Sequence, residues 1–167
     1  MIQVLYLDDE LHNLTAFRAA FRRDFQVHVT TEPTEAVELL RSEDIEVIIS
    51  DQKMPTISGV EFFELITGEF PDPVRMLLTG HADMDAVIDA INKGQIYKYI
   101  AKPWNEAELR GIVQGGSKIY RARKADQDQS KRLLRSFDEA LALSGQIVDQ
   151  LKDKGETGCD GPTSQHV

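Results

Sequence analysis

Five polar side chains with catalytic potential stand directly after short apolar runs of the sequence. They are Asp8, Asp9, Asp51, Thr79 and Lys102. Three carboxylates brought together repel one another and need a counter-cation, which a hard divalent ion such as Mg²⁺ provides through oxygen ligands. A carboxylate can also act as a nucleophile toward phosphorus, while a metal, a lysine and a hydroxyl hold the oxygens of the transferred group. If the fold gathers these residues, they form the parts of a site for phosphoryl transfer to an aspartate.

The sequence around these residues predicts the elements that gather them. Five apolar runs alternate with five stretches of helical pattern. The runs are residues 3–7, 27–30, 47–50, 74–78 and 97–101, and the helical stretches are residues 11–23, one opened by Pro33, 60–67, 83–93 and one that starts near Asn105. This alternation predicts a doubly wound α/β fold, (βα)5, with a parallel sheet of flavodoxin-like order 2-1-3-4-5. Sites in such sheets form at the carboxyl ends of the strands, where these polar side chains would meet.

Composition and charge argue against a membrane protein, a secreted protein and a nucleic-acid-binding protein. The chain of 167 residues is 41% hydrophobic and 28% charged, and no apolar run approaches the roughly 18 residues of a membrane span. The N-terminal residues lack the basic-then-apolar pattern of a signal peptide. The net charge of −9 argues against binding to nucleic-acid phosphates, and a single cysteine, Cys159, excludes a disulfide within one chain. We therefore expect a cytoplasmic protein that binds neither nucleic acid nor membranes.

Charge and patterning divide the chain into two parts. Residues 1–120 carry 11 Lys and Arg against 20 Asp and Glu, whereas residues 121–167 carry eight of each sign. In the second part a heptad seam recurs at spacings of four and three residues, at Leu133, Phe137, Ala140, Ser144, Ile147 and Leu151. We expect a helical extension over residues 121–152 and a disordered tail over residues 153–167. The seam predicts a homodimer through residues 133–151, and packing of this helix back on the first part is the alternative.

Four motifs give residues 1–120 a resemblance to the receiver domain of two-component response regulators. They are LYLDDE (5–10), IISDQKMPTISGVEF (48–62), MLLTGHAD (76–83) and YKYIAKPW (97–104). The resemblance implies a Mg²⁺-dependent switch that accepts a phosphoryl group from a sensor histidine kinase or a phosphotransfer protein. It implies that the group is lost by self-dephosphorylation, so the protein is a timed switch and not a metabolic enzyme.

The resemblance also implies which residues hold the metal and the phosphoryl group. Asp51 resembles the phosphoacceptor. Asp9 and Asp51 would ligate Mg²⁺ through their carboxylates, Lys53 through its backbone carbonyl, and Asp8 through a metal-bound water. Lys102 would pair first with the Asp51 carboxylate and then with the phosphate.

A conformational switch is implied by the same resemblance. Thr79 would hydrogen-bond a phosphoryl oxygen, and Tyr99 would swing inward as Thr79 moves toward the phosphate. The face made by the fourth helix, the fifth strand and the fifth helix would then change its partner binding or self-association. The Lys102–Pro103 peptide bond would be cis. Two details are less usual for the family, namely His81 two residues beyond Thr79 and the pair Gly115-Gly116 inside the last helix.

Other interpretations of the same residues remain open. Singly, Asp8 or Asp9 would be typical of a helix N-cap, and Asp51 of a turn. A haloacid-dehalogenase-like phosphatase also uses an aspartate nucleophile and Mg²⁺, but its nucleophile follows the first strand in an Asp-x-Asp pattern, where this chain has Asp8-Asp9-Glu10. A flavodoxin-like flavin carrier needs a Ser-, Thr- or Gly-rich phosphate loop there, and this loop is acidic. The chain is also interpretable as the receiver of a larger regulator whose output domain follows residue 167.

Overall fold

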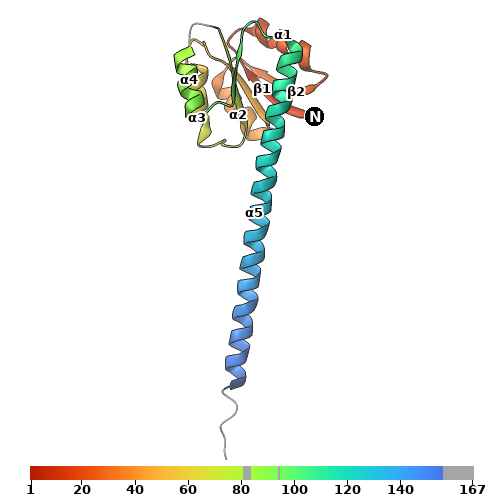
Figure 1. The fold of residues 1–167 in the computed structure, drawn as a ribbon, viewed down its shortest axis with the longest axis vertical. Coiled ribbons are helices and arrows are strands. Elements are labelled where there is room, and N and C mark those ends of the chain that lie inside the picture. The colour runs from red at the N-terminus through yellow and green to blue at the C-terminus, as the bar shows by residue number, and fades with distance from the viewer. Residues whose placement is uncertain (81–83, 94, 156–167) are drawn as a thin grey trace, which may run out of the picture. The chain divides into compact units, whose positions relative to one another are not determined.

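The computed structural model describes residues 1–80, 84–93 and 95–155, and within them five parallel strands alternate with five helices. The strands are β1 (Ile2–Leu7), β2 (Phe25–Thr30), β3 (Val47–Asp51), β4 (Val74–Thr79) and β5 (Lys98–Ala101). The helices are α1 (Leu11–Phe21), α2 (Pro33–Ser42), α3 (Gly59–Thr67), α4 (Met84–Asn92) and α5 (Glu106–Gly155). The strand order is β2-β1-β3-β4-β5, which confirms the flavodoxin-like prediction. Figure 1 labels the five helices and the strands β1 and β2.

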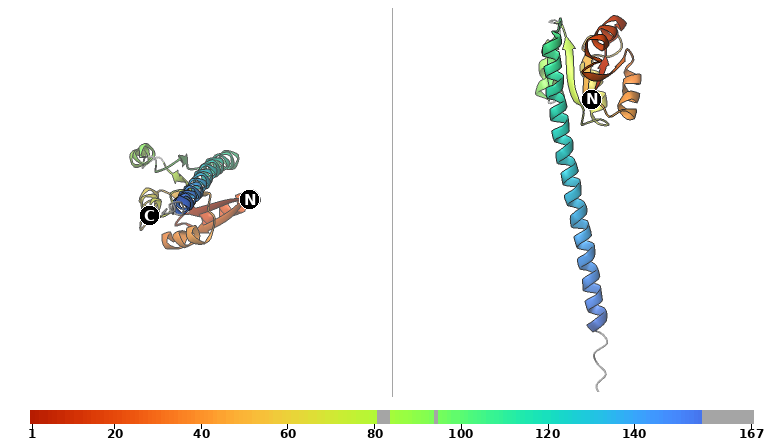
Figure 2. Two further views of the ribbon diagram at one scale, coloured as in Figure 1. Left: turned by 90° about the horizontal axis from the view of Figure 1, so that it is seen from below. Right: turned by 90° about the vertical axis from the view of Figure 1, so that its right-hand side faces the viewer.

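Helices cover both faces of the sheet because the three central strands β1, β3 and β4 carry apolar side chains on both sides. On one face, α1 and the first part of α5 pack on β1, β3 and β4 in a core that includes Phe17, Phe21 and Val113. On the other face, α2, α3 and α4 enclose a second core around Ile48 and Leu77. The strands are seen between these helices in the views of Figure 2. Two buried layers of this kind hold the carboxyl edge of the sheet rigidly in place.

The strand register aligns the ends of the strands that carry the polar residues. Leu7 of β1 pairs with Ser50 of β3, Asp51 pairs with Leu78 of β4, and Thr79 pairs with Ala101 of β5. Residues that follow these positions therefore lie along one edge, as predicted. The peptide bond between Lys102 and Pro103 is cis, also as predicted.

Local features fix where α3 and α5 begin. Ser58 and Glu61 form a reciprocal capping box at the start of α3. A Cβ at Gly59 would lie 2.5 Å from the main-chain oxygen of Asp51, so only glycine lets α3 approach the end of β3 this closely. The side chain of Asn105 accepts hydrogen bonds from the amides of Ala107 and Glu108 at 2.9 and 3.1 Å and so caps α5.

The glycine pair inside the last helix does not interrupt it, because α5 is continuous from Glu106 to Gly155. A Cβ at Gly116 would lie 2.4 Å from the methyl group of Met76 and 3.3 Å from Val74. Glycine at this position brings the helix against β4, and the packing it permits offsets the roughly 1 kcal/mol that glycine costs inside a helix. Trp104, just before α5, packs with its ring centroid 6.1 Å from that of Phe17 and lies partly buried against this core.

Polar side chains near the amino ends of β3 and β4 hold α5 at the opposite edge of the sheet. Glu46 accepts hydrogen bonds from two nitrogens of Arg121 at 2.8 and 2.9 Å and from Ser117 Oγ at 2.5 Å. Lys124 Nζ pairs with Asp72 at 3.1 Å. We call these contacts the α5 anchor. The first compact unit runs from Met1 to Lys124 and contains both partners of each of these contacts.

The α5 anchor makes stability depend on pH. Burial alone would raise the pKa of Glu46, but hydrogen bonds from Arg121 and Ser117 outweigh it and lower the pKa. Folding thus favours the ionised form of Glu46. The stabilisation of the folded state by this carboxylate is complete above its unfolded pKa of about 4.3, and it is lost as the pH falls through the lower pKa of the folded state. Glu46→Gln is expected to lower the free energy of unfolding by about 1–2 kcal/mol at neutral pH, a modest value because Arg121 is largely exposed.

Urea unfolding of wild type and Glu46→Gln across the acid range measures this contribution. The difference between the two is expected to be largest near neutral pH and to vanish in acid. The exposed Glu38→Gln is the matched control and should show little difference at any pH. A Glu46 difference that persists unchanged into acid would contradict a stabilising ion pair between Glu46 and Arg121.

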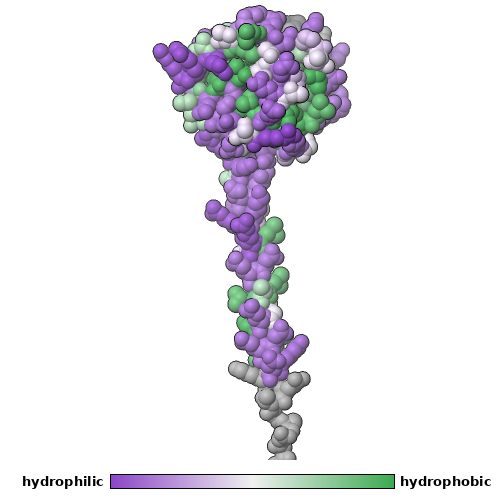
Figure 3. Space-filling model, turned by 180° about the vertical axis from the view of Figure 1, so that it is seen from behind, coloured by the Kyte–Doolittle hydropathy of each residue, from purple (hydrophilic) through white to green (hydrophobic). Residues whose placement is uncertain are grey.

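The second unit begins at Ala125 and contains the rest of α5. Its large apolar side chains are exposed, and Figure 3 shows apolar side chains along this part of the helix. They are Leu133, Leu134, Phe137, Leu141, Leu143, Ile147, Val148 and Leu151. The large apolar residues of the predicted seam are among them, and Leu134, Leu141 and Val148 form a second column beside the seam. No helix in the described part of the chain is long and apolar enough to cross a membrane.

Several sequence predictions lie wholly or partly outside the described residues. His81 and Asp83, the predicted first residue of the fourth helix, belong to the undescribed stretch 81–83, and Gly94 is likewise outside. The helix α5 reaches Gly155, so residues 153–155 of the expected tail are helical, while 156–167 lie outside the described residues.

Candidate functional site

Two of the predicted carboxylates meet at the carboxyl edge of the sheet through the ammonium group of Lys102. Lys102 Nζ lies 2.5 Å from Asp51 Oδ1 and 3.5 Å from Asp8 Oδ2. Asp8 follows β1, Asp51 ends β3 and Lys102 follows β5, so three separate strands place these groups. Both aspartates are buried, whereas the Lys102 side chain is about one-third exposed. The result is a buried pair of anions bridged by one cation that reaches solvent.

Asp51 is held in one orientation by its own loop. The amide of Lys53 donates to Asp51 Oδ2 at 3.0 Å, and Ser50 Oγ donates to the main-chain oxygen of Asp51 at 3.0 Å. Burial raises the pKa of the Asp51 carboxyl, and the charge of Asp8 adds to the rise, although Lys102 and the Lys53 amide act in the opposite direction. For Lys102, burial opposes the charge, but the contacts with Asp51 and Asp8 outweigh it and raise the pKa. At neutral pH the environment thus keeps Lys102 charged beside the carboxylates.

Asp8 is fixed by a set of donors that the residue pattern did not point to. Tyr6 Oη donates to Asp8 Oδ2 at 2.5 Å, and the amide of Glu10 donates to Oδ1 at 2.9 Å. The side-chain amide of Asn13, in the first turn of α1, lies 3.1 and 3.0 Å from the two oxygens. Tyr6 shares a strand face with Asp8 because the two are two positions apart in the sequence, and this spacing was the only sequence signal for the contact. Asn13 became a neighbour only through the geometry of the loop before α1.

Thr79 ends β4, where it pairs with Ala101 just before Lys102, and Tyr99 lies within β5. Thr79 is buried, and its hydroxyl donates to the main-chain oxygen of Gly80 at 2.8 Å. The amide of Lys102 donates to the main-chain oxygen of Thr79 at 3.0 Å, which links the two strand ends. Tyr99 in β5 is 39% exposed, and Tyr97, predicted as part of the strand, precedes it and is also exposed. Neither tyrosine is a core residue.

The donor set has the chemistry of a magnesium site. Asp8, Asp51, Asp9 and the main-chain carbonyl of Lys53 offer hard oxygen ligands, which Mg²⁺ prefers. Within the described residues, however, no three His, Cys, Asp or Glu side chains are grouped as metal ligands. The Asp9 side chain is exposed, and Lys102 stands between the two buried carboxylates as their counter-cation. The residues fit the ion by their chemistry, and Mg²⁺ would supply further neutralisation of charge on the transferred group.

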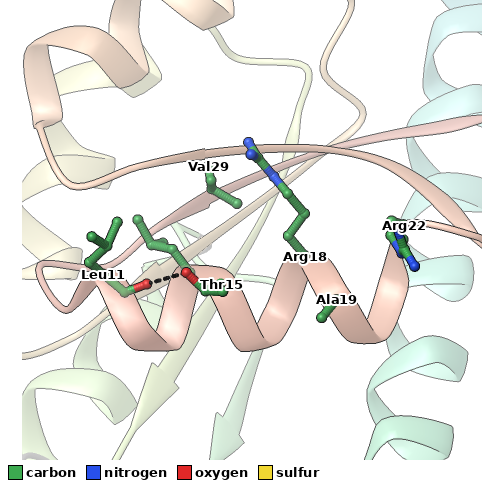
Figure 4. A pocket seen from close by; sticks show the side chains of 7 residues that line it. Leu11, Thr15, Arg18, Ala19, Arg22 and Val29 are labelled. Atoms are coloured by element: carbon green, nitrogen blue, oxygen red, sulfur yellow. Dashed lines mark hydrogen bonds between the residues drawn. The ribbon is translucent and has the colours of Figure 1, made fainter.

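Two cavities lie away from this group of residues. One, of about 310 Å³, lies between α1 and β2 and is lined by apolar side chains with Arg18 and Arg22 (Figure 4). Another, of about 370 Å³, is lined by residues of β5 and the start of α5 and includes Tyr99 and Trp104. Asp51 lines neither of these two cavities.

Comparison with known families shows the family to which the chain belongs. The response regulator receiver domain matches residues 4–114. The chain belongs to this family. The match covers β1 through the first part of α5, and with it all the predicted site residues. The receiver interpretation of the four motifs is therefore confirmed, and the phosphatase and flavin-carrier interpretations are not supported.

Curated relatives agree with this assignment. The hydrogenase transcriptional regulatory protein HoxA of Bradyrhizobium diazoefficiens is 37% identical over 72% of this chain and 25% of its own length. HoxA of Cupriavidus necator is 37% identical over 66% of this chain and 23% of its own length. The chain therefore spans about a quarter of the length of these relatives.

Among solved structures, a response regulator receiver domain protein from Clostridium thermocellum matches with a TM-score of 0.67 and 26% identity, over 75% of this chain and 99% of that one. A crystal structure described as adenylate cyclase from Rhodopirellula baltica matches with a TM-score of 0.74 and 25% identity, over 77% and 96% of the two chains. These neighbours share the fold of the first compact unit.

Proposed function

We propose that this receiver domain is a phosphoacceptor switch in which Asp51 accepts a phosphoryl group. The supporting observation is the buried Asp51 carboxylate in contact with Lys102 and next to Asp8 at the carboxyl edge of the sheet. An Asp51 oxygen attacks phosphorus, the bond from phosphorus to the donor breaks, and an acyl phosphate forms on Asp51. Lys102 then pairs with the new phosphoryl oxygens, since its ammonium already lies at the attacking carboxylate. Hydrolysis of the acyl phosphate by water returns the free aspartate.

Magnesium is the proposed cofactor of this transfer. Asp9 and Asp51 would ligate it through carboxylates, Lys53 through its main-chain carbonyl, and Asp8 through a bound water. The buried and negatively charged edge formed by Asp8 and Asp51 supports this assignment, because a single lysine leaves the pair with a net negative charge before any phosphate arrives.

We propose that the conformational switch couples a movement of Thr79 to a movement of Tyr99. The buried hydroxyl of Thr79 donates to the main-chain oxygen of the next residue, a bond that is easily exchanged, so it can turn toward a phosphoryl oxygen at little cost. Tyr99, half-exposed on β5, would fill the space that Thr79 leaves. The face formed by α4, β5 and α5 would thereby change its affinity for a partner or for a second copy.

The proposed donor is a sensor histidine kinase or a phosphotransfer protein, and the proposed location is the cytoplasm, where such donors act. Because the chain spans about a quarter of its curated relatives, its interpretation as the receiver part of a larger regulator fits their lengths. No direct contact with nucleic acid is proposed for residues 1–120, whose charge is strongly negative.

Self-association is proposed through residues 133–151 of α5. Their apolar side chains are exposed in the single chain at heptad spacing, and such a stripe is stable in water only when it is covered. A second copy of the helix offers a matching stripe, and the second column of Leu134, Leu141 and Val148 widens it beyond the predicted seam.

Intact-mass spectrometry tests the proposed chemistry. With Mg²⁺ and acetyl phosphate, the protein is expected to gain the mass of one phosphoryl group, because acetate is a good leaving group. Chelation of Mg²⁺ is expected to suppress the gain, and hydroxylamine should remove the group because it cleaves acyl phosphates. A phosphoryl adduct that forms equally in a chelator, or that resists hydroxylamine, would overturn the proposal.

A further inference from the structure

The Asp8 carboxylate uses nearly all of its hydrogen-bonding capacity within the chain. A carboxylate accepts at about four lone-pair positions. Tyr6 Oη, the Glu10 amide and the Asn13 side-chain amide lie 2.5–3.1 Å from its oxygens, and Lys102 Nζ lies farther away at 3.5 Å. Asp8 is fully buried, so solvent does not compete for these positions. The contact with Lys102, on the side of Asp51, is therefore the longest of those that Asp8 makes.

We propose that Tyr6 and Asn13 are positioning residues for magnesium, which hold the Asp8 carboxylate in the orientation in which its Oδ2 faces Lys102 beside Asp51. The inference rests on the proposed magnesium site and goes beyond it by assigning two residues that do not themselves touch the ion. Outer partners that hydrogen-bond a ligating carboxylate orient it, and their loss costs roughly 10–100-fold in metal affinity. Tyr6 and Asn13 are such partners, because both hydrogen-bond the Asp8 carboxylate.

The surroundings of Tyr6 make its hydroxyl suited to this role. Its ring packs in the core against Phe17 at a centroid distance of 4.6 Å, so the strand and the core together fix the position of the hydroxyl. Only the hydroxyl reaches Asp8. Removing it therefore leaves the packing of the ring intact but allows the Asp8 carboxylate to rotate toward Lys102. A rotated Asp8 would draw Lys102 from Asp51 and turn Oδ2 away from the side of Asp51, where the ion is needed.

The test is a magnesium titration of Tyr6→Phe and Asn13→Ala against wild type. Binding is followed by the fluorescence of Trp104, the single tryptophan, which lies two residues beyond Lys102. It is also followed by the Mg²⁺ dependence of phosphate uptake from acetyl phosphate. Each variant is expected to raise the Mg²⁺ concentration at half-saturation about tenfold, while the uptake rate at saturating Mg²⁺ stays near that of wild type.

Tyr120→Phe is the matched control. The Tyr120 hydroxyl also donates to a carboxylate, Asp44 at 2.9 Å, but at the other edge of the sheet. It is expected to leave the magnesium midpoint unchanged. If Tyr6→Phe and Asn13→Ala bind Mg²⁺ as tightly as wild type, the positioning role is overturned. Tighter binding, because a lone pair of Asp8 is freed, would overturn it too. In both cases the proposed function stands. If wild type responds to Mg²⁺ by neither readout, the proposed magnesium site and this inference fail together.

Discussion

Replacement of Asp51 by Asn is expected to abolish phosphate uptake from acetyl phosphate in the presence of Mg²⁺. The amide keeps the size of the side chain but removes the anionic oxygen that attacks phosphorus. Lys102 remains in place because it also pairs with Asp8, so no other carboxylate is brought into the position of Asp51. Intact-mass measurement should show the phosphoryl adduct in wild type and none in Asp51→Asn.

The folded state is expected to survive this replacement. Burial and the charge of Asp8 raise the pKa of Asp51 above its unfolded value. A raised carboxyl pKa means that the folded state binds the proton more tightly, so at neutral pH the ionised Asp51 opposes folding. An uncharged Asn removes this opposition, and the melting temperature of Asp51→Asn should not fall strongly.

Asp44→Asn is the matched control for the loss of phosphate uptake. Asp44 lies before β3, at the opposite edge of the sheet from Asp51, and accepts a hydrogen bond from Tyr120. It should gain the phosphoryl group as wild type does. Equal uptake by Asp51→Asn and wild type would show that the phosphoacceptor is another residue.

The ends of the strands could be predicted from the sequence because a polar residue ends each apolar run. The run of residues 47–50 is apolar on both faces, as a central parallel strand must be, and the polar Asp51 ends it. The alternation of strands with helices and the handedness of their connections leave few strand orders, and the flavodoxin-like order was predicted as the common one for five strands. Those two rules together place Asp8, Asp51 and Lys102 at one edge, and the structure has them in contact.

The orientation of the acidic residues could not be predicted from the same pattern. Asp8 and Asp9 are adjacent, so the strand end points them in different directions, and Asp8 is buried while Asp9 is exposed. Which of the two faces Asp51 depends on the loop that leads into α1. The Asn13 contact depends on the same loop, because the loop sets how the first turn of α1 lies against Asp8. Such contacts are set by tertiary geometry and leave no mark on residue spacing.

The course of the last helix shows packing overriding local propensity. Two successive glycines predict a weak point, since each costs about 1 kcal/mol in a helix. In the structure Gly116 lies against Met76, where a larger residue would collide, and the α5 anchor holds the following turn through Glu46 and Asp72. The gain comes from residues far apart in the sequence, and so it was not visible in the local pattern.

Charged residues placed in the seam of α5 are expected to convert a dimeric chain to a monomer. Phe137 and Ile147 are exposed in the single chain, and covering a large apolar side chain contributes about 1.5–3 kcal/mol. The double variant Phe137→Glu, Ile147→Glu removes both contributions and places like charges opposite one another across the interface. Sedimentation velocity should show wild type as a dimer and this variant as a monomer.

A control variant and a truncation show whether the seam itself holds the dimer together. Ala142→Glu adds a negative charge to the face opposite the seam and is expected to leave the dimer intact. A chain that ends at Lys124 retains the whole first compact unit with the α5 anchor and lacks the seam, so it should sediment as a monomer. If the full-length protein is monomeric at high concentration, with or without phosphate on Asp51, dimerisation through this helix is wrong. The exposed stripe would then have to be covered by packing back on the first unit, because water opposes leaving so many apolar side chains uncovered.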